Sequence, residues 1–505
     1  MTKPSILLLV LAACGSPGGS PTAAPGPSAA RSTARERLAP CNLDGVTGPV
    51  LCGSYAVWEN RATRQGRKID LRIVVLPALG PDVAPDPVVE FAGGPGDAAG
   101  NAVRDWAQQR EVRAHRDIVL VDQRGTGASH RLDCKIPRDP GDVQAYFEPS
   151  LPPAEVHRCR GELEQSADLA QYTTSIAADD LDEVRGWLGY DKINLHGGSY
   201  GTRAAQVYLR RHGDHVRSAL LIGVAAMDQY LPLFHARDGK HSLDRLFEAC
   251  AGAPACAAAF PDLRAEHERV LAGLDRERGR ATVDSPVDHH PVAVTIPRDI
   301  FAEQIRFSLY SAGVSSVTPF VIHRAAQGDF EPFARMAMSW EPAFRGILAY
   351  GMHLSVTCAE DVPFITPAMV ESATAGTYLR GYRVLQQVAA CRDWPRGEIP
   401  AGYHQPVRSD VPVLLVSGPY DPVTPPRFAA GVARQLPHAV QLTIPDGHHG
   451  QGGLAHPECI AGITARFFDR GTADGLDTSC VATMVRPPFV TDAATFAALL
   501  QAAGD

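Results

Sequence analysis

The sequence predicts an α/β protein in which a mainly parallel β-sheet, flanked by helices, is interrupted by a large helical cap. Short apolar segments end repeatedly at glycine-rich or polar turns, as buried parallel strands do. Strand-like and helix-like segments alternate near both ends of the chain but not in its middle. The 505 residues, 45% of them hydrophobic and 21% charged, supply enough apolar material for a large core.

The elements of this fold follow in chain order. Residues 41–224 form the first part of the predicted sheet domain, residues 225–404 the helical cap, and residues 405–505 the second part of the sheet domain. The cap is therefore expected to follow the sixth strand. Strands are predicted at Leu71–Pro77, Pro87–Phe91, Asp117–Val121, Ile193–Leu195, Ala219–Ile222, Val411–Val416 and Val440–Ile444, with a brief strand-like segment in the cap at Val292–Ile296. Helices of the sheet domain are predicted at Ala178–Leu188, Thr202–Arg211, Arg427–Leu436 and Pro457–Arg470.

The amino terminus predicts export. The apolar run Ile6–Ala13 is too short to span a bilayer and is typical of a signal-peptide core. It ends in LAAC at residues 11–14, which resembles the lipobox of bacterial lipoproteins, so residues 1–14 are predicted to be a lipoprotein signal with Cys14 lipidated; an ordinary cleaved signal is the alternative. Residues 15–37 are rich in Gly, Ser, Pro and Ala and are predicted to be a flexible linker. We expect the protein in the bacterial cell envelope, held by a lipid anchor, or secreted.

The cysteines agree with an oxidising compartment. Of the 11 cysteines, ten remain when Cys14 is set aside, and an even number in an exported chain favours disulfides. Neighbours in the sequence suggest the pairs Cys41 with Cys52, Cys134 with Cys159, Cys250 with Cys256, Cys358 with Cys391, and Cys459 with Cys480, although sequence alone does not fix connectivity. A zinc site is the competing interpretation, but no C-x-x-C occurs, so no metal and no other cofactor is expected.

The charge balance limits the partners. The chain has 48 Lys and Arg against 56 Asp and Glu, a net charge of -8, and no cluster of basic residues. Nucleic-acid binding needs clustered cations to neutralise phosphates, so no nucleic-acid partner is expected. The expected membrane contact is only through the lipid anchor, and the sequence leaves the oligomeric state open.

Ser199 is the predicted nucleophile. It lies in the motif GGSYG at residues 197–201, between a predicted strand and a predicted helix. In the pattern G-x-S-x-G the turn is so tight that a side chain at either glycine would clash, and the turn exposes the serine hydroxyl at the sheet edge. A glycine-rich turn without chemical consequence is the alternative, which the flanking strand and helix disfavour.

A serine needs a base and an acid that orients the base, in the chain order Ser, Asp, His. Asp421 follows the strand Val411–Val416, on a turn at the sheet edge where α/β proteins place functional groups. The next predicted strand is followed by His448 and His449, of which only one can face Ser199 because adjacent side chains on a turn point in different directions.

The oxyanion hole is predicted from the motif GGPG at residues 93–96. Backbone N–H groups that stabilise an oxyanion need a loop free of Cβ atoms, and Pro95 has no N–H to donate. We assign the hole to the backbone of Gly94 or its neighbour together with that of Tyr200, the residue after the nucleophile. A plain turn is the alternative.

Together, GGPG, DQRGTGAS at residues 122–129, GGSYGT at 197–202, GPYDPVTP at 418–425 and the final GHHG resemble the α/β-hydrolase peptidases of the proline iminopeptidase and tripeptidyl aminopeptidase group. The resemblance covers residues 41–224 and 405–490, and the carboxyl terminus resembles the tripeptidyl aminopeptidase type. It implies an α/β-hydrolase fold, a helical cap over the active site, and a peptide substrate cleaved at its amino terminus. The family usually has Gly-His-Gly where this chain has two histidines, and alignment on Pro445 puts His449 at the catalytic position while leaving His448 open.

The resemblance also suggests further roles. An exopeptidase must recognise a free α-amine, which calls for a carboxylate in the cap. Glu360 and Asp361, beside Cys358, match a region where the family carries acidic residues; a solvated acidic pair is the alternative. We expect Asp122 and Arg124 to pair and hold the loops near GGPG, rather than Arg124 to contact substrate.

The sequence therefore leads to three hypotheses about the function. The leading one is an exported serine aminopeptidase that releases short peptides or single residues through an acyl-enzyme at Ser199. The second is a carboxylesterase or lipase with the same triad, since fold and triad do not fix the leaving group. The third is a binding protein derived from a hydrolase, which the complete set of Ser, Asp, His and oxyanion motifs disfavours.

Overall fold

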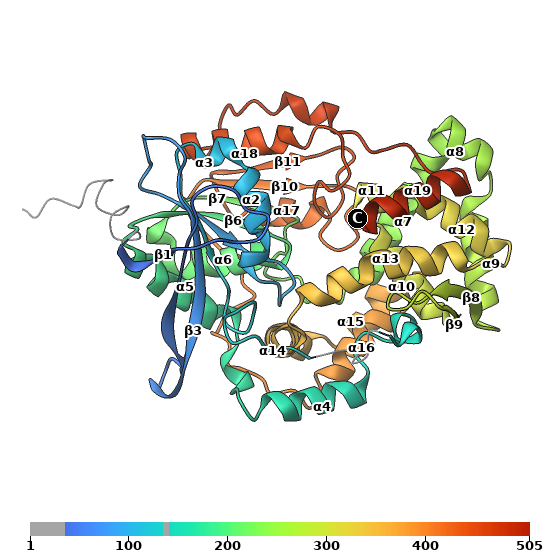
Figure 1. Cartoon of the computed structure of the whole chain (residues 1–505), viewed down its shortest axis with the longest axis horizontal. Helices are drawn as coiled ribbons and strands as arrows, with labels where there is room; N and C mark the ends of the chain where they lie inside the picture. The colour runs from blue at the N-terminus through green and yellow to red at the C-terminus, as the bar shows by residue number, and fades with distance from the viewer. Residues whose placement is uncertain (1–35, 135–140, 505) are drawn as a thin grey trace, which may run out of the picture.

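The computed structural model describes residues 36–134 and 141–504, which form a nine-stranded sheet with helices on both faces and a helical region beside it (Figure 1). The predicted signal peptide with Cys14 lies outside the described residues, as does the predicted linker apart from its last two residues.

The sheet is mixed but mainly parallel, as predicted. Its strands lie in the order β1 (Ala39–Pro40), β2 (Leu51–Asn60), β3 (Gln65–Leu76), β5 (Ile118–Val121), β4 (Val88–Phe91), β6 (Ile193–Gly198), β7 (Val216–Ile222), β10 (Val413–Ser417) and β11 (Ala439–Thr443). The pairs β1–β2, β2–β3 and β3–β5 are antiparallel, and the other pairs are parallel. The chain crosses from β3 to β4 and then returns to β5, which lies between them, so β4 lies beside β6 and the loop after β4 lies next to the turn after β6.

The predicted helices of the sheet domain are present, with shifts of a few residues at their ends. They are α5 (Thr174–Leu188), α6 (Tyr200–His212), α17 (Pro426–Ala433) and α18 (Glu458–Arg470). Helix α5 begins at an N-cap, Thr173, and ends at Gly189, whose φ of +85° closes the last turn.

Alternate side chains of the strands pack into two separate cores, one on each face of the sheet. Val75 and Leu221 point to the core on the side of α5 and α6, whereas Val74 and Leu220 point to the core on the side of α18. This alternation follows from the two-residue period of a strand, and burial on both sides explains why these strands read as continuous apolar runs.

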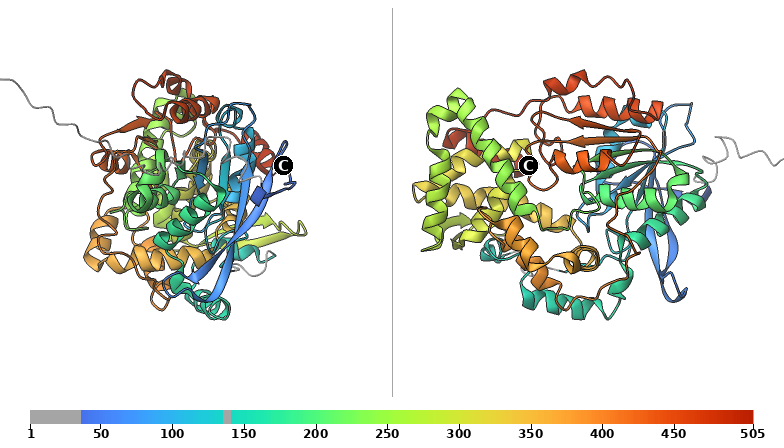
Figure 2. Two further views of the ribbon diagram at one scale, coloured as in Figure 1. Left: turned by 90° about the vertical axis from the view of Figure 1, so that its left-hand side faces the viewer. Right: turned by 180° about the vertical axis from the view of Figure 1, so that it is seen from behind.

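The helical region follows β7, which is the seventh strand if the two-residue β1 is counted and the sixth if it is not. Its elements are α7 (His235–Gly252), α8 (Pro254–Ala259), α9 (Leu263–Leu274), β8 (Gly279–Asp284), β9 (Pro291–Ile296), α10 (Arg298–Ser308), α11 (Ala312–Ser315), α12 (Thr318–Ala326), α13 (Glu331–Ile347), α14 (Tyr350–Glu360), α15 (Pro367–Thr374) and α16 (Tyr382–Ala390). Strand β9 matches the predicted strand-like segment. The views of Figure 2 show this region beside the carboxyl edge of the sheet, and it has a core of its own, which includes Leu246, Phe301 and Phe333.

Two segments outside residues 225–404 pack into the core of the helical region, so this core extends beyond the predicted boundaries of the cap. One is η2 (Val143–Phe147), whose Val143 and Phe147 are buried there. The other is the last helix, α19 (Ala493–Gly504), which packs beside α13 and α12, with Phe496 5.2 Å from Phe320 between ring centroids. Both segments carry apolar side chains that only the helical region can bury.

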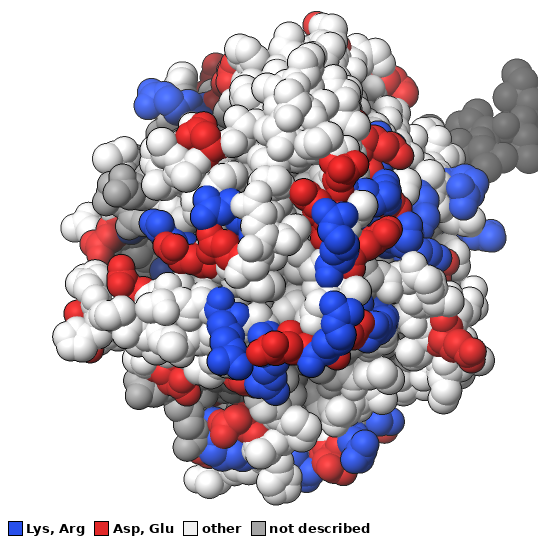
Figure 3. All heavy atoms as spheres, turned by 90° about the vertical axis from the view of Figure 1, so that its right-hand side faces the viewer, with Lys and Arg blue, Asp and Glu red and all other residues white. Residues whose placement is uncertain are grey.

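The five predicted disulfides are all present, each joining the pair of cysteines expected from their neighbourhood in the sequence. They suggest an extracellular or exported protein. Within residues 36–134 and 141–504, no helix combines the length and apolar character that a membrane span needs. Over the helical region, acidic and basic side chains are intermingled on the face that Figure 3 shows.

Candidate active site

Ser199 occupies the turn between β6 and α6. Its backbone has φ +55° and ψ -126°, a strained conformation for a residue other than glycine. A Cβ on Gly201 would lie 1.8 Å from the carbonyl oxygen of Phe91, and one on Gly197 would lie 2.8 Å from that of Gly201. Gly201 is therefore required by the close packing of the turn against β4, and Gly197 by the packing of the turn against the start of α6, as the motif predicts.

The turn also sets Ser199 against the end of β7. The N–H of Ser199 donates a hydrogen bond to the carbonyl oxygen of Ile222, at 2.9 Å. The next residue, Gly223, faces His449, since a Cβ on Gly223 would lie 3.4 Å from Cε1 and Nδ1 of that ring. The turn at Ile222–Gly223 therefore lies in contact with both Ser199 and His449.

Asp421 and His449 are brought together across two turns at the sheet edge. Nδ1 of His449 lies 2.8 Å from Oδ2 of Asp421. The carboxylate also accepts hydrogen bonds from the N–H groups of Val423 and Thr424, at 2.9 and 2.8 Å, and from the Thr424 hydroxyl, at 2.6 Å. Burial acts to raise the pKa of Asp421, but His449 and the Thr424 hydrogen bonds outweigh it, and the pKa is lowered. An ionised Asp421 fixes the proton of His449 on Nδ1 and leaves Nε2 free to accept one.

His448 takes a different direction. Its Nδ1 lies 2.7 Å from the carbonyl oxygen of Leu309 and its Nε2 lies 3.3 Å from the hydroxyl of Ser315, both in the helical region. Its ring stacks on Tyr420 and only 3% of the residue is exposed. Burial lowers the pKa of His448 to about 4. His448 therefore belongs to the packing between the sheet domain and the helical region.

The residues of the predicted oxyanion hole lie at the nucleophile. The GGPG loop runs past Ser199, whose Cβ is 3.4 Å from the position of a Cβ on Gly93. Gly94 has φ +106°, and a Cβ there would lie 2.6 Å from the nitrogen of Gly96. Tyr200 is the first residue of α6, so its N–H has no acceptor within the helix. Gly94, Ser199 and Tyr200 line the same cavity.

Glu360 and Asp361 do not line that cavity, and both are fully buried. Glu360 accepts hydrogen bonds from the N–H and hydroxyl of Thr174, at 2.6 and 2.7 Å, and from the hydroxyl of Tyr403. Asp361 accepts from Arg203, at 2.6 Å, and from the N–H of Leu231, at 2.9 Å. Thus neither carboxylate is open to a substrate amine, and the prediction from the acidic pattern receives no support.

Glu360 has a supporting position instead. The hydroxyl of Thr174, which donates to Glu360, lies 2.7 Å from the hydroxyl of Tyr200, so the carboxylate lies behind the residue that follows the nucleophile. Burial raises the pKa of Glu360 to about 7, against the lowering effect of its three hydrogen bonds.

Arg124 has a structural position, as predicted, but the prediction that it pairs with Asp122 is wrong. It forms a bidentate ion pair with Asp180 on α5, at 2.6 and 2.9 Å, and both side chains are buried. Asp122 accepts instead from Arg72, at 3.4 Å, and from the N–H of Gly100, at 2.8 Å. The two residues are close in sequence, but the tight turn after β5 sends their side chains to different neighbours.

The cavity at Ser199 lies between the sheet edge and the helical region and has an empty volume of about 1150 Å³, which includes space open to solvent. The sheet side contributes Gly94, Ser199, Tyr200, Val423 and Thr424. The helical side and the segment after η2 contribute polar and charged groups that sequence reasoning missed, since their pattern in the sequence is that of ordinary amphipathic helices. These are chiefly Glu148, Ser150, His235, Glu303, Arg306, Tyr310, His353, Tyr382, Arg383 and Gln386.

Among the described residues, the one group of three side chains close enough to share a metal ion is Asp182, His212 and His215. It lies at the far end of α6 from Ser199. Arg185 donates to Asp182 at 2.7 Å and approaches Nε2 of His215 to 3.4 Å, so a cation already occupies this group. The cluster does not fit a second cation well and has no place in the chemistry at Ser199.

Comparison with known proteins agrees with this geometry. A family model described as alpha/beta hydrolase fold matches residues 86–263, which include the GGPG loop and Ser199. A second model, described as TAP-like protein, matches residues 377–480, which include Asp421 and His449.

Curated relatives match only part of the chain. Serine protease Hip1 of Mycobacterium tuberculosis is 30% identical over 192 residues, which is 35% of this chain and 36% of that protein. Tripeptidyl aminopeptidase of Streptomyces lividans is 28% identical over 195 residues, 35% of each chain. Proline iminopeptidase of Neisseria gonorrhoeae is 26% identical over 138 residues, 27% of this chain and 32% of that protein. The chain therefore spans about a third of the length of these relatives.

The two family models match the parts of the chain that hold β4–β7 and β10–β11, and the sheet order and the turn at Ser199 agree with them. The sheet domain therefore has the α/β-hydrolase fold, and the chain is similar to TAP-like proteins, to tripeptidyl aminopeptidase and to proline iminopeptidase.

Proposed function

We propose that this protein is a serine peptidase that removes residues or short peptides from the amino terminus of its substrates through an acyl-enzyme at Ser199. The observation that carries the proposal is the ordered pair of the buried Asp421 and His449, at 2.8 Å, against the turn that also holds Ser199. The similarity to a serine protease and to two aminopeptidases supports peptides as the substrate class.

The proposed reaction has two halves. The Ser199 Oγ attacks the scissile carbonyl carbon while Nε2 of His449 takes the hydroxyl proton, and Asp421 stabilises the imidazolium that forms. The oxyanion is stabilised by the N–H groups of Tyr200 and Gly94. Collapse breaks the C–N bond, and His449 gives the proton to the leaving amine. Water, activated by His449, then attacks the acyl-enzyme, which releases the amino-terminal fragment and restores Ser199.

An aminopeptidase needs a carboxylate for the substrate α-amine, and two carboxylates line the cavity. Arg306 already binds Glu303 through two hydrogen bonds, at 2.6 and 3.0 Å. Glu148 accepts one hydrogen bond, from the amide of Gln144 at 3.1 Å, and has no ion pair among the described residues. Glu148 is therefore the better site for the amine, with a charge-assisted hydrogen bond as the basis of recognition.

The test is hydrolysis of chromogenic amides that carry one or three residues, with free or acetylated amines, together with short-chain esters. We expect cleavage of free-amine amides, loss of that cleavage in Ser199→Ala, and a selective loss of the free-amine preference in Glu148→Gln. Asp142→Asn, an exposed residue six positions earlier, is the matched control. Cleavage of esters alone would favour the carboxylesterase, because the fold and triad serve both reactions.

Export with a lipid anchor is part of the proposal. The lipobox-like LAAC at residues 11–14 and the five disulfides support it. Labelling of cells with an alkyne fatty acid should mark the protein and fail to mark Cys14→Ser. Labelling of both forms, or of neither, would contradict the anchor at Cys14.

A further inference from the structure

The cavity over Ser199 contains a guanidinium that the protein itself leaves poorly neutralised. Arg383, on α16, donates from Nη1 to the side-chain oxygen of Gln387, at 3.0 Å. Its one carboxylate neighbour among the described residues is Glu303, with 4.0 Å between Nε and Oε1. Arg306 binds both oxygens of that carboxylate and also donates to the Tyr310 hydroxyl, at 3.2 Å. Glu303 is therefore matched by Arg306, and Arg383 is left in excess.

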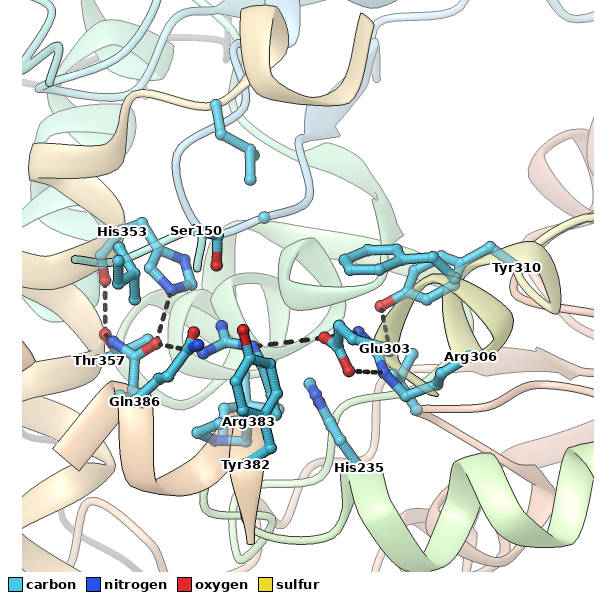
Figure 4. Close-up of a pocket in the computed structure, with 18 of the residues that line it drawn as sticks. Ser150, His235, Glu303, Arg306, Tyr310, His353, Thr357, Tyr382, Arg383 and Gln386 are labelled. Carbon is cyan, nitrogen blue, oxygen red and sulfur yellow. Dashed lines mark hydrogen bonds and ion pairs between the residues drawn. The ribbon is translucent and has the colours of Figure 1, made fainter. Parts of the chain in front are cut away.

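Further polar groups around Arg383 are also left without partners. Neither polar atom of the Gln386 amide makes a hydrogen bond of good geometry within the described part of the chain, and the same holds for Nδ1 of His235. Figure 4 shows Arg383 between Glu303 and Gln386, with the His235 ring pointing from α7 toward the same space. Buried polar groups without partners are uncommon in proteins, and a site that collects several is arranged for a ligand.

We propose that Arg383 binds a carboxylate of the substrate, so that the enzyme prefers peptides that bring an acidic group into the cavity. This inference rests on the proposed peptidase function and names its substrate class. The planar guanidinium offers parallel N–H donors that match the two oxygens of a carboxylate, and the Gln386 amide can add a further donor. The carboxylate is that of an Asp or Glu side chain or the terminal carboxylate of a short peptide, and both present the same two oxygens.

The charges of the whole cavity agree with such a substrate. Its lining holds two glutamates and two arginines. Arg306 and Glu303 cancel, which leaves Glu148 for the substrate amine and Arg383 for the substrate carboxylate. Burial lowers the pKa of Arg383, so a bound anion would compensate a guanidinium held in an unfavourable environment. Arg383 contributes little to the structure as an ion pair, because Glu303 lies 4.0 Å away and both oxygens of that carboxylate already bind Arg306.

The test compares matched peptides on wild type and on charge-removing variants. Tripeptide amides with Glu or Gln at the first, second or third position measure recognition of a side chain. Unmodified tetrapeptides and the same peptides with an amidated carboxyl end measure recognition of the terminal carboxylate. Wild type should show kcat/KM at least tenfold higher for the acidic member of one of these pairs. Arg383→Gln should reduce that ratio to less than threefold, mainly through KM, and Arg383→Lys should keep part of it.

Arg380→Gln is the matched control. Arg380 lies three residues earlier, is exposed, does not line this cavity, and pairs with Asp275 at 2.7 Å, so its loss should leave the ratio unchanged. The rate of Ser199 labelling by a fluorophosphonate reports whether each variant is folded. A wild type without preference, or an Arg383→Gln protein that labels normally and keeps the full ratio, would overturn the proposal.

A binding measurement separates this proposal from the peptidase itself. Ser199→Ala protein should bind the acidic peptide at least tenfold more tightly than its neutral partner by calorimetry, and Arg383→Gln in the same background should remove the difference. If wild type cleaves no peptide but this difference is present, the proposed function fails and the carboxylate site stands. If peptides are cleaved and the difference is absent, the carboxylate site fails alone.

Discussion

The imidazole of His449 lies 2.8 Å from the buried carboxylate of Asp421, whereas the adjacent His448 contacts the carbonyl of Leu309 in the helical region. The tandem histidines thus have separate contacts: His449 faces the carboxylate and is the base in the proposed reaction, whereas His448 packs between the sheet domain and the helical region. The sequence alone did not decide which of the two histidines is the base, and the first prediction distinguishes their roles.

His449→Ala should lower kcat by about 10⁴-fold or more, because the serine then has no base. His448→Ala should keep kcat within about tenfold and lower the melting temperature, since it removes a buried ring that stacks on Tyr420. Steady-state kinetics and thermal unfolding of both variants decide between the two. The reverse pattern would show that His448 is the base.

Asp421→Asn tests the orienting carboxylate. The amide keeps the shape of the side chain but can donate to Nδ1 of His449, which then presents a protonated Nε2 to the serine. We expect a loss of about 10⁴-fold in kcat with a nearly unchanged KM. A loss of less than tenfold would mean that another group orients His449.

Gly201→Ala tests the tight turn under the nucleophile. The added methyl group would meet the Phe91 carbonyl at 1.8 Å, so β4 and α6 would have to separate, and we expect a poorly folded protein. Gly186→Ala is the matched control on α5. Nothing lies within 4 Å of its Cβ position, so it should be neutral or raise the stability by about 0.5–1 kcal/mol. Equal urea midpoints for the two variants would contradict this account of the elbow.

Glu360 gives a pH dependence of stability. The pKa of its carboxyl is about 7 in the folded protein, against an ordinary value of 4.5. Below pH 4.5 the group is protonated in both states. Between pH 4.5 and 7 only the unfolded chain releases the proton, so its contribution to the free energy of unfolding falls as pH rises, by up to about 3 kcal/mol.

The variant Glu360→Gln should remove that contribution. The stability difference between wild type and Glu360→Gln should therefore shift against wild type from pH 5 to pH 8, measured by urea unfolding. Glu371→Gln, an exposed residue on α15, should keep the wild-type slope. A Glu360→Gln protein with the same slope as wild type would show that Glu360 is ionised in the fold.

The sheet domain and its catalytic loops could be predicted because their signals are local. Strands buried on both faces read as apolar runs, the elbow requires its glycines, and Asp421 and His449 follow strands directly. Strand β2 was not predicted, since it is largely half-exposed and its sequence, LCGSYAVWEN, is not a continuous apolar run. The disulfides join cysteines that are neighbours in the sequence, so they too could be found.

The substrate side of the site could not be predicted. Glu148, Glu303 and Arg383 come from three segments far apart in the chain, and only the packing of the helical region brings them to one cavity. The acidic pair Glu360 and Asp361 looked like a binding motif, but a sequence does not show that Thr174 and Arg203 already occupy these carboxylates. The partner of Arg124 was missed for the same reason, because Asp180 reaches it from helix α5.

The proposed function requires an acyl-enzyme at Ser199 that forms with His449 as the base. The most direct test is to mix the protein with an activated ester of a free-amine peptide and to quench the reaction rapidly. The intact mass of the protein is then measured, and peptide mapping locates any adduct. We predict a single acyl adduct on Ser199 in wild type and no adduct in Ser199→Ala or His449→Ala. An adduct on another residue, or turnover that persists in Ser199→Ala, would contradict the account.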